Sequence, residues 1–321
     1  MTLVEHHPEV PVRRWNVGET QITQVTEAPV EVGLLDGLIA QATPDAVKQI
    51  PWLYPHYANA DGQLTWNLHC YVIEVRETRI LVDTGVGNHK TNLRLPNWSG
   101  WNTDFLSRLT AAGHPPECID IVLCTHMHLD HLGWNTTLVD GVWTPTFPNA
   151  THLFVRDEFD YHAGICATVN SALAALDGEL EPDAIRRRQL RLGFDQSVWP
   201  LREAGMIDLV PSGYEVAEGI HYVPSPGHTP AHHSVRVASR GESAFITGDF
   251  IHHPVQIART QWSSQSDFDP TLAARHRRSF LESCSETATV VFGSHFTGSS
   301  AGTVIRDGGS FRLEALEGEQ D

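Results

Sequence analysis

Four side chains that commonly bind metals fall within six residues, in the segment His126-x-His128-x-Asp130-His131. Imidazole and carboxylate groups suit zinc and related divalent ions. A single histidine is more often a hydrogen-bonding residue, but four polar groups directly after an apolar strand need a specific role. One tetrahedral ion could not accept all four from so short a loop, whereas two neighbouring ions could share them. Two metals about 3.5–4 Å apart polarise a substrate oxygen and lower the pKa of a water between them. The segment therefore predicts a dinuclear hydrolytic site.

Further ligand-type residues each follow a short apolar run that is typical of a strand: Asp83, His228, Asp249 and His295. Loops at strand ends are where a rigid scaffold displays functional groups. Each of these residues is a weak signal alone, and their value lies in the order in which they occur.

The ordered motifs are His-x-His-x-Asp-His, Gly-His-Thr-Pro-x-His at 227–232, Thr-Gly-Asp at 247–249 and Gly-Ser-His at 293–295. In this order the chain resembles the metallo-β-lactamase-fold metallohydrolases, over residues 66–297. It is most similar to the branch of methyl parathion hydrolase and the acyl-homoserine lactonases. The resemblance implies an α/β (α+β) fold, a four-layer αββα sandwich that holds two metals between its sheets.

The resemblance also assigns the candidate residues. It implies metal ligands in two sets, with His126, His128 and His228 on one ion, Asp130, His131 and His295 on the other, and Asp249 bridging both. Asp83 and His232 would support these ligands from outside. The cofactors would be two divalent ions, with zinc expected first and Mn, Fe or Co as alternatives, because nitrogen and oxygen ligands accept all four.

Two residues are candidates for catalysis. Asp130 could pass a proton while it stays bound to its metal. His252 stands three residues after the bridging aspartate, where acyl-homoserine lactonases carry a tyrosine, and could donate a hydrogen bond or a proton to substrate; simple solvation is the alternative. Trp134 could wall the substrate pocket or be a core residue. The run 186–188 with Arg191 could bind an anionic substrate, although such a run is more often the solvated face of a helix.

The expected function is hydrolysis, in which a metal-bridging hydroxide cleaves a carboxylic ester, a lactone or a phosphotriester in a small molecule. One alternative is a thioesterase that resembles glyoxalase II, and another is a non-catalytic binding or sensor protein on the same fold. A Gly-x-Ser-x-Gly elbow near a suitable base is missing from the sequence, which disfavours a serine hydrolase.

The amino-acid composition limits the classes of molecule that we expect this protein to bind. The 321 residues include 39 acidic and 22 basic side chains, for a formal charge of −17, which disfavours nucleic acid. Apolar segments are too short for a membrane span, so we expect a small-molecule substrate, no nucleic acid and no membrane, and a homodimer by family analogy. Five scattered cysteines without a CxxC pair suit the cytoplasm.

The elements that must position these residues follow from periodicity. We expect residues 1–14 to be a flexible tail and 15–321 a single domain, with an irregular excursion at 33–65 that could lie over the site. Apolar patterns predict strands at 21–28, 68–75, 79–82, 119–123, 152–155, 219–223, 234–238, 243–246 and 289–292, and helices at 104–112, from 183, and at 270–284.

Overall fold

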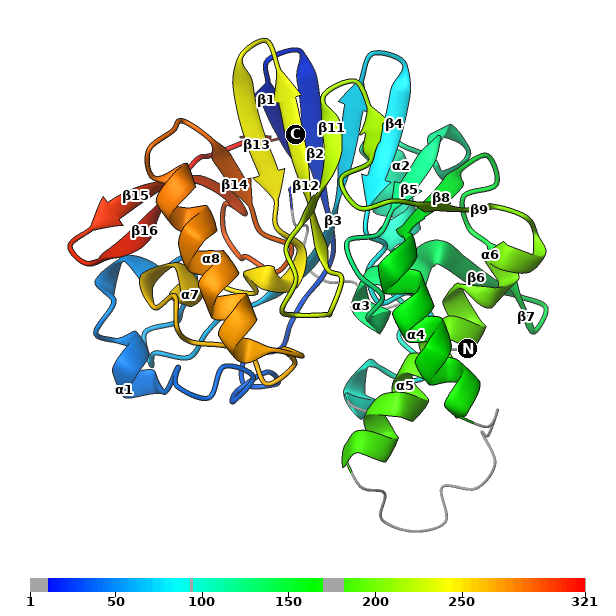
Figure 1. Ribbon diagram of the computed structural model, residues 1–321, viewed down its shortest axis with the longest axis horizontal. Coiled ribbons are helices and arrows are strands. Elements are labelled where there is room, and N and C mark those ends of the chain that lie inside the picture. The colour runs from blue at the N-terminus through cyan, green and yellow to red at the C-terminus, as the bar shows by residue number, and fades with distance from the viewer. Residues whose placement is uncertain (1–10, 93–94, 170–181, 321) are drawn as a thin grey trace.

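The computed structural model describes residues 11–92, 95–169 and 182–320, and in these residues two β-sheets lie face to face between helices (Figure 1). The first sheet has the order β17 (Glu319–Gln320), β1 (Arg13–Val17), β2 (Thr20–Pro29), β3 (Asn67–Val75), β4 (Thr78–Val82), β5 (Ile121–Leu123), β8 (Thr151–Val155) and β9 (Ile207–Val210). The second has the order β10 (Glu215–Ala217), β11 (Ile220–Pro224), β12 (His233–Ser239), β13 (Glu242–Ile246), β14 (Val290–Phe292), β15 (Ala301–Asp307) and β16 (Ser310–Ala315). A separate hairpin joins β6 (Thr136–Val139) and β7 (Val142–Pro145).

Helices cover the outer faces of the two sheets, with α4 and α5 beside the first sheet and α8 along the second (Figure 1). The α-helices are α1 (Pro44–Val47), α2 (Phe105–Ala111), α3 (Leu129–Leu132), α4 (Arg156–Thr168), α5 (Pro182–Ser197), α6 (Trp199–Glu203), α7 (Val255–Ala258) and α8 (Pro270–Cys284). Short 3₁₀ turns are η1 (Pro51–Leu53), η2 (Pro96–Trp98), η3 (Pro116–Cys118), η4 (Gly133–Asn135) and η5 (Gly248–Phe250). None of the helices in the described part of the chain has the length and apolar character that crossing a bilayer requires.

Three apolar layers hold these four structural layers together. The central layer lies between the sheets and includes Trp15, Tyr71 and Phe292, all buried. A second layer packs the first sheet against its helices, and a third packs the second sheet against α7 and α8. Because each sheet has apolar side chains on both faces, it must be covered on both sides. The predicted αββα sandwich is confirmed.

Parallel strand pairs decide where the polar loops gather. In the first sheet β4 runs parallel to β5, with Val82 opposite Leu123, and in the second β13 runs parallel to β14, with Ile246 opposite Phe292. Carboxyl ends of parallel neighbours lie at the same edge of a sheet, where ligands usually bind. The loops after all four strands therefore emerge at one edge of the sandwich.

The structure corrects the predicted tail. Residues 1–10 lie outside the described residues, but Arg13 and Arg14 already belong to β1, where they pair with Gln320 and Glu319. The tail prediction is wrong for Arg13 and Arg14 because β17 offers these two residues a backbone partner.

The start of α8 agrees with prediction, since the Asp269 side chain accepts a hydrogen bond from Leu272 N at 2.9 Å.

Candidate metal centre

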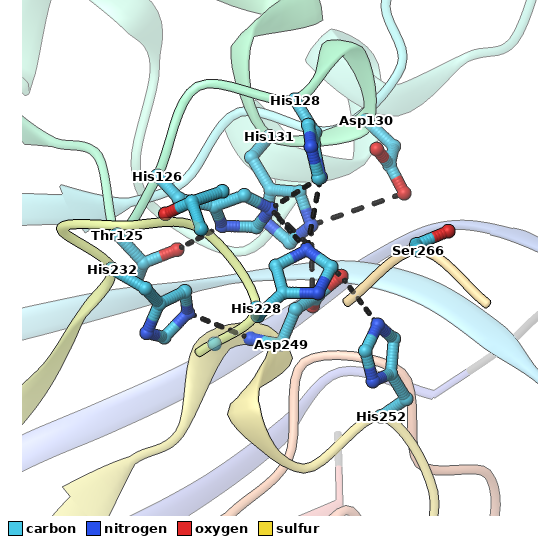
Figure 2. Close-up of polar contacts among 12 residues, drawn as sticks. Thr125, His126, His128, Asp130, His131, His228, His232, Asp249, His252 and Ser266 are labelled. Carbon is cyan, nitrogen blue, oxygen red and sulfur yellow. Dashed lines mark hydrogen bonds and ion pairs between the residues drawn. The ribbon is translucent and has the colours of Figure 1, made fainter. Parts of the chain in front are cut away.

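Three histidine nitrogens converge at one point of this edge (Figure 2). His126 and His128 come from the loop between β5 and α3, and His228 follows β11. His126 Nε2 lies 3.1 Å from His128 Nδ1, and His228 Nε2 lies 3.2 Å and 2.9 Å from those two atoms. Nitrogens of a tetrahedral zinc site, each about 2.0–2.1 Å from the ion, are roughly 3.3 Å apart. The spacing of the three nitrogens therefore fits one tetrahedral cation.

A second group lies beside the first and contains Asp130, His131 and His295. Asp130 Oδ2 is 3.8 Å from His131 Nε2 and 3.9 Å from His295 Nε2. All of these atoms, with one oxygen of Asp249, lie close enough together to hold a metal ion. The sequence-predicted ligands thus form two neighbouring groups.

Asp249 stands between the two groups and turns one oxygen to each. Its Oδ1 is 3.3 Å from His131 Nε2 and 3.0 Å from His295 Nε2. Its Oδ2 is 3.6 Å from His228 Nε2 and 3.9 Å from His126 Nε2. This is the arrangement that a carboxylate needs to bridge two cations.

Buried atoms without partners mark the same place. His131 Nε2 and Asp249 Oδ1 are buried, and neither has a hydrogen-bond partner among the described residues. Leaving such groups unpaired costs free energy. Although burial opposes ionisation, the imidazoles of His295 and His131 hold the pKa of the Asp249 carboxyl well below its usual range. A buried carboxylate surrounded by imidazoles is a donor set that fits divalent cations, which would replace the imidazole protons.

The outer nitrogens of the rings are held by acceptors behind them. Asp83 Oδ2 lies 2.8 Å from His131 Nδ1, and the same carboxylate accepts hydrogen bonds from the Thr125 backbone and hydroxyl, both at 2.8 Å. His126 Nδ1 is 3.0 Å from Thr125 Oγ1. When Nδ1 carries the proton, Nε2 presents its lone pair inward. The Asp83 carboxylate therefore lies behind His131, and its backbone is left-handed with φ of 57°.

His232 supports the Asp249 loop. Its Nε2 accepts a hydrogen bond from Asp249 N at 3.0 Å, and its Nδ1 lies 2.8 Å from Ser225 Oγ. A Cβ on Gly248, which has φ of 56°, would come within 2.6 Å of His232 Nε2. Only glycine fits between the ring and the turn. The supporting role expected for His232 is therefore consistent with its contacts.

Comparison with known proteins agrees with this geometry. The family model described as the metallo-beta-lactamase superfamily matches residues 66–163, which include the His126–His131 segment. Over these residues, which are less than half of the chain, the sequence is similar to that superfamily. The N-acyl homoserine lactonase AiiA of Bacillus thuringiensis subsp. kurstaki is 22% identical over 241 residues, covering 70% of this chain and 80% of that protein. An N-acyl homoserine lactonase of Bacillus sp is 22% identical over 179 residues, so the match spans 52% of this chain and only 57% of that relative.

Two solved structures share the fold over nearly the whole chain. The hydrolase AbOPH superimposes with a TM-score of 0.77 at 22% identity, covering 98% of this chain and 100% of that one. AidC, a dizinc quorum-quenching lactonase solved in complex with a product, gives a TM-score of 0.73 at 22% identity and covers 95% of this chain and 97% of its own.

Two residues that hold the ligand loops escaped the sequence analysis. Asp267 Oδ1 lies 3.0 Å from His228 Nδ1, so it stands behind the first group as Asp83 stands behind the second. Glu158 in α4 accepts hydrogen bonds from Met127 N at 3.2 Å and from Thr229 Oγ1 at 2.8 Å, which ties both loops of the first group together. No spacing rule connects these acids to the motifs, although the side chains of both are buried.

A cavity opens over the two groups and exposes His128, Asp130, His228, Asp249, His252 and His295 on its floor. Its walls are largely apolar and include Leu35, Leu38, Trp66, Leu95, Trp98 and Leu129. The excursion at 33–65 therefore does reach the site, through two leucines. The cavity volume is about 170 Å³, against roughly 10–15 Å³ for one water in the same measure, so it holds about a dozen non-hydrogen atoms.

His252 lies on the cavity floor, with Nε2 3.4 Å from Asp249 Oδ2. Burial lowers the pKa of His252 to about 4. Its Nδ1 is buried and has no hydrogen-bond partner among the described residues. The structure thus brings His252 to the ligands, as the sequence suggested.

Trp134 does not wall this cavity. The side chain is 2% exposed, stacks on Phe105 with ring centroids 5.6 Å apart and donates from Nε1 to Glu27 Oε1 at 2.7 Å. The pocket prediction is wrong because η4 turns Trp134 away from the ligands and into the core between the first sheet and its helices.

Proposed function

We propose that this chain is a metal-dependent hydrolase that binds two divalent ions and cleaves an ester-type bond, with a lactone as the first candidate. The observation that carries the proposal is Asp249, whose two oxygens face the two ligand groups. Two bound ions would polarise the substrate's oxygen and lower the pKa of the attacking water. A carboxylic ester and a phosphotriester remain the other candidate substrates.

The protein groups would orient substrate and move protons. Asp130 is the most accessible carboxylate of the centre, with a side chain 26% exposed, and it lines the cavity. It would accept the proton lost by the attacking water and pass it to the leaving oxygen. His252 would donate a hydrogen bond to substrate from the nitrogen that lacks a partner. The apolar walls would hold an acyl or aryl group and exclude competing water.

We place a lactone first among the candidate substrates because of the names of the similar proteins. The similar proteins AiiA and AidC carry the name lactonase, and AidC is described as dizinc. Zinc is accordingly the first metal that we propose, with Mn, Fe or Co as alternatives. A cytoplasmic location and a homodimer belong to the same proposal.

The test begins with metal content. Protein purified without added metal should hold about two equivalents of a divalent transition metal, and Asp249→Ala should lose most of it together with activity. The substrate panel comprises an acyl-homoserine lactone, an aryl ester, a phosphotriester and S-lactoylglutathione. Less than one equivalent of metal, with no activity restored by Zn, Mn or Co, would exclude the two-metal hydrolase. A clear preference for the thioester would favour the glyoxalase II-like alternative.

A further inference from the structure

Helix α5 presents one face to the cavity over the ligand groups. Arg186, Gln189, Leu190 and Gly193 line the cavity from this helix. They are spaced at three, four and seven residues, so they share one side of the helix. Among the described residues that line the cavity, Arg186 is the one arginine or lysine.

The depth of Arg186 follows from the helix rise. Gly193 lies at the level of the ligand loop, because a Cβ there would be 3.8 Å from Leu129 Cδ1. Arg186 stands seven residues earlier, roughly 10 Å along the axis at 1.5 Å per residue. It also lines a second hollow with Tyr161 and Phe268, so its side chain lies at the mouth of the cavity.

Among the described residues, no hydrogen bond or ion pair occupies the Arg186 guanidinium. The side chain is half-buried, and among the described residues no acid pairs with it. Arg191 on the same helix differs, since it is paired with Asp195 at 2.8 Å. A guanidinium has a planar fork of donors that matches a carboxylate through two parallel hydrogen bonds. At a half-exposed mouth, such a pair loses only part of its hydration on forming.

Building on the proposed function, we propose that the substrate's acyl chain ends in a carboxylate, which Arg186 binds at the cavity mouth while the ester group lies over the ligand groups. The apolar walls between these two ends suit a short methylene chain, and the cavity holds about a dozen non-hydrogen atoms. The substrate class is therefore a half-ester of a small dicarboxylic acid or a lactone of a small hydroxy-dicarboxylic acid, not an ester or lactone with a plain alkyl tail.

The test compares two anilides that differ only at the tail, because an anilide resists cleavage and reports binding alone. Calorimetry on the metal-loaded protein measures 6-anilino-6-oxohexanoate against hexananilide. The wild type should bind the carboxylate at least tenfold more tightly. Arg186→Gln should abolish this preference, and Arg187→Gln should keep it, because Arg187 is an exposed neighbour that does not line the cavity. Equal binding of both anilides by the wild type would overturn the inference. So would an equal loss of preference in the two variants.

Hydrolysis separates this inference from the proposed function. The matched esters are p-nitrophenyl hexanoate and the p-nitrophenyl half-ester of adipic acid. Cleavage of both at equal kcat/KM, with equal anilide binding, would remove the role of Arg186 and leave the hydrolase in place. Cleavage of neither ester or of any lactone would count against the hydrolase, while the anilides would still decide whether Arg186 binds the anion. Thermal unfolding of each variant confirms that it is folded.

Discussion

Asp267→Asn should lower the affinity for one of the two proposed metal ions and leave the affinity for the other unchanged. The Asp267 carboxylate lies 3.0 Å from His228 Nδ1, accepts from Ser264 N at 2.9 Å and stands 3.8 Å from Arg277 Nη2. Asparagine keeps the shape but removes the charge that makes the inward nitrogen of His228 a stronger donor to metal. Loss of such an outer partner costs about 10–100-fold in metal affinity, or roughly 1.4–2.7 kcal/mol. Arg277 still donates to the Phe250 carbonyl at 2.9 Å, so the fold should persist.

The assay is competition for metal between the protein and a chromophoric chelator. It measures the affinity of each of the two metal equivalents separately. Asp83→Asn is the matched control, because it removes the same charge behind His131 in the other group. Each variant should release a different ion first, which cobalt substitution distinguishes spectroscopically. Folded variants that both hold two ions with wild-type affinity would refute the argument that these carboxylates tune the ligands.

Three further predictions concern the surroundings of the site. Burial raises the pKa of Glu27 from 4.5 to about 7, so the folded state binds the extra proton, and stability should fall by up to about 3 kcal/mol as pH rises from 4.5 to 7. Glu27→Gln should flatten that slope in urea titrations, and an unchanged slope would contradict it. Trp134→Phe should lower the free energy of unfolding in urea by about 1–2 kcal/mol, because the hydrogen bond to Glu27 is lost. A large change in KM without this loss would indicate that Trp134 lines the substrate pocket. Gly248→Ala should lower the metal content measured by elemental analysis, because the added Cβ would clash with the His232 ring. A normal metal content would show that the turn can shift to accommodate the Cβ.

The convergence of the candidate metal ligands was predictable because each follows a strand whose apolar run is visible in the sequence. His126 follows β5 and Asp249 follows β13, and short loops leave such side chains little choice of position. Asp267 was not predictable, because it lies 39 residues from His228 in an irregular loop and only the tertiary fold brings them together. The same is true of Glu158, which reaches the site across 71 residues from Thr229.

Other features were missed for local reasons. The hairpin of β15 and β16 is joined by Asp307-Gly308-Gly309, a turn signal that the strand analysis did not use. Trp134 was ambiguous because a residue beside a ligand loop can face either way, and the direction depends on the backbone turn of η4. The excursion at 33–65 has no clear period, so its two cavity leucines could not be assigned from sequence.

The proposed metal ligands come from both sheets and meet at one centre, so a bound cation would help to hold the two sheets together. His126 and His131 come from the first sheet's loops, while Asp249 and His295 come from the second's. A cation that binds only the assembled halves adds about 4 kcal/mol of stability at a free concentration 1,000 times its dissociation constant. By reciprocity, any change that loosens the contact between the sheets makes cation binding less favourable by the same free energy. With the proposed metal centre in place, a substitution at Phe292, in the apolar layer between the sheets, would make the folding of this protein depend on the metal supply of its surroundings.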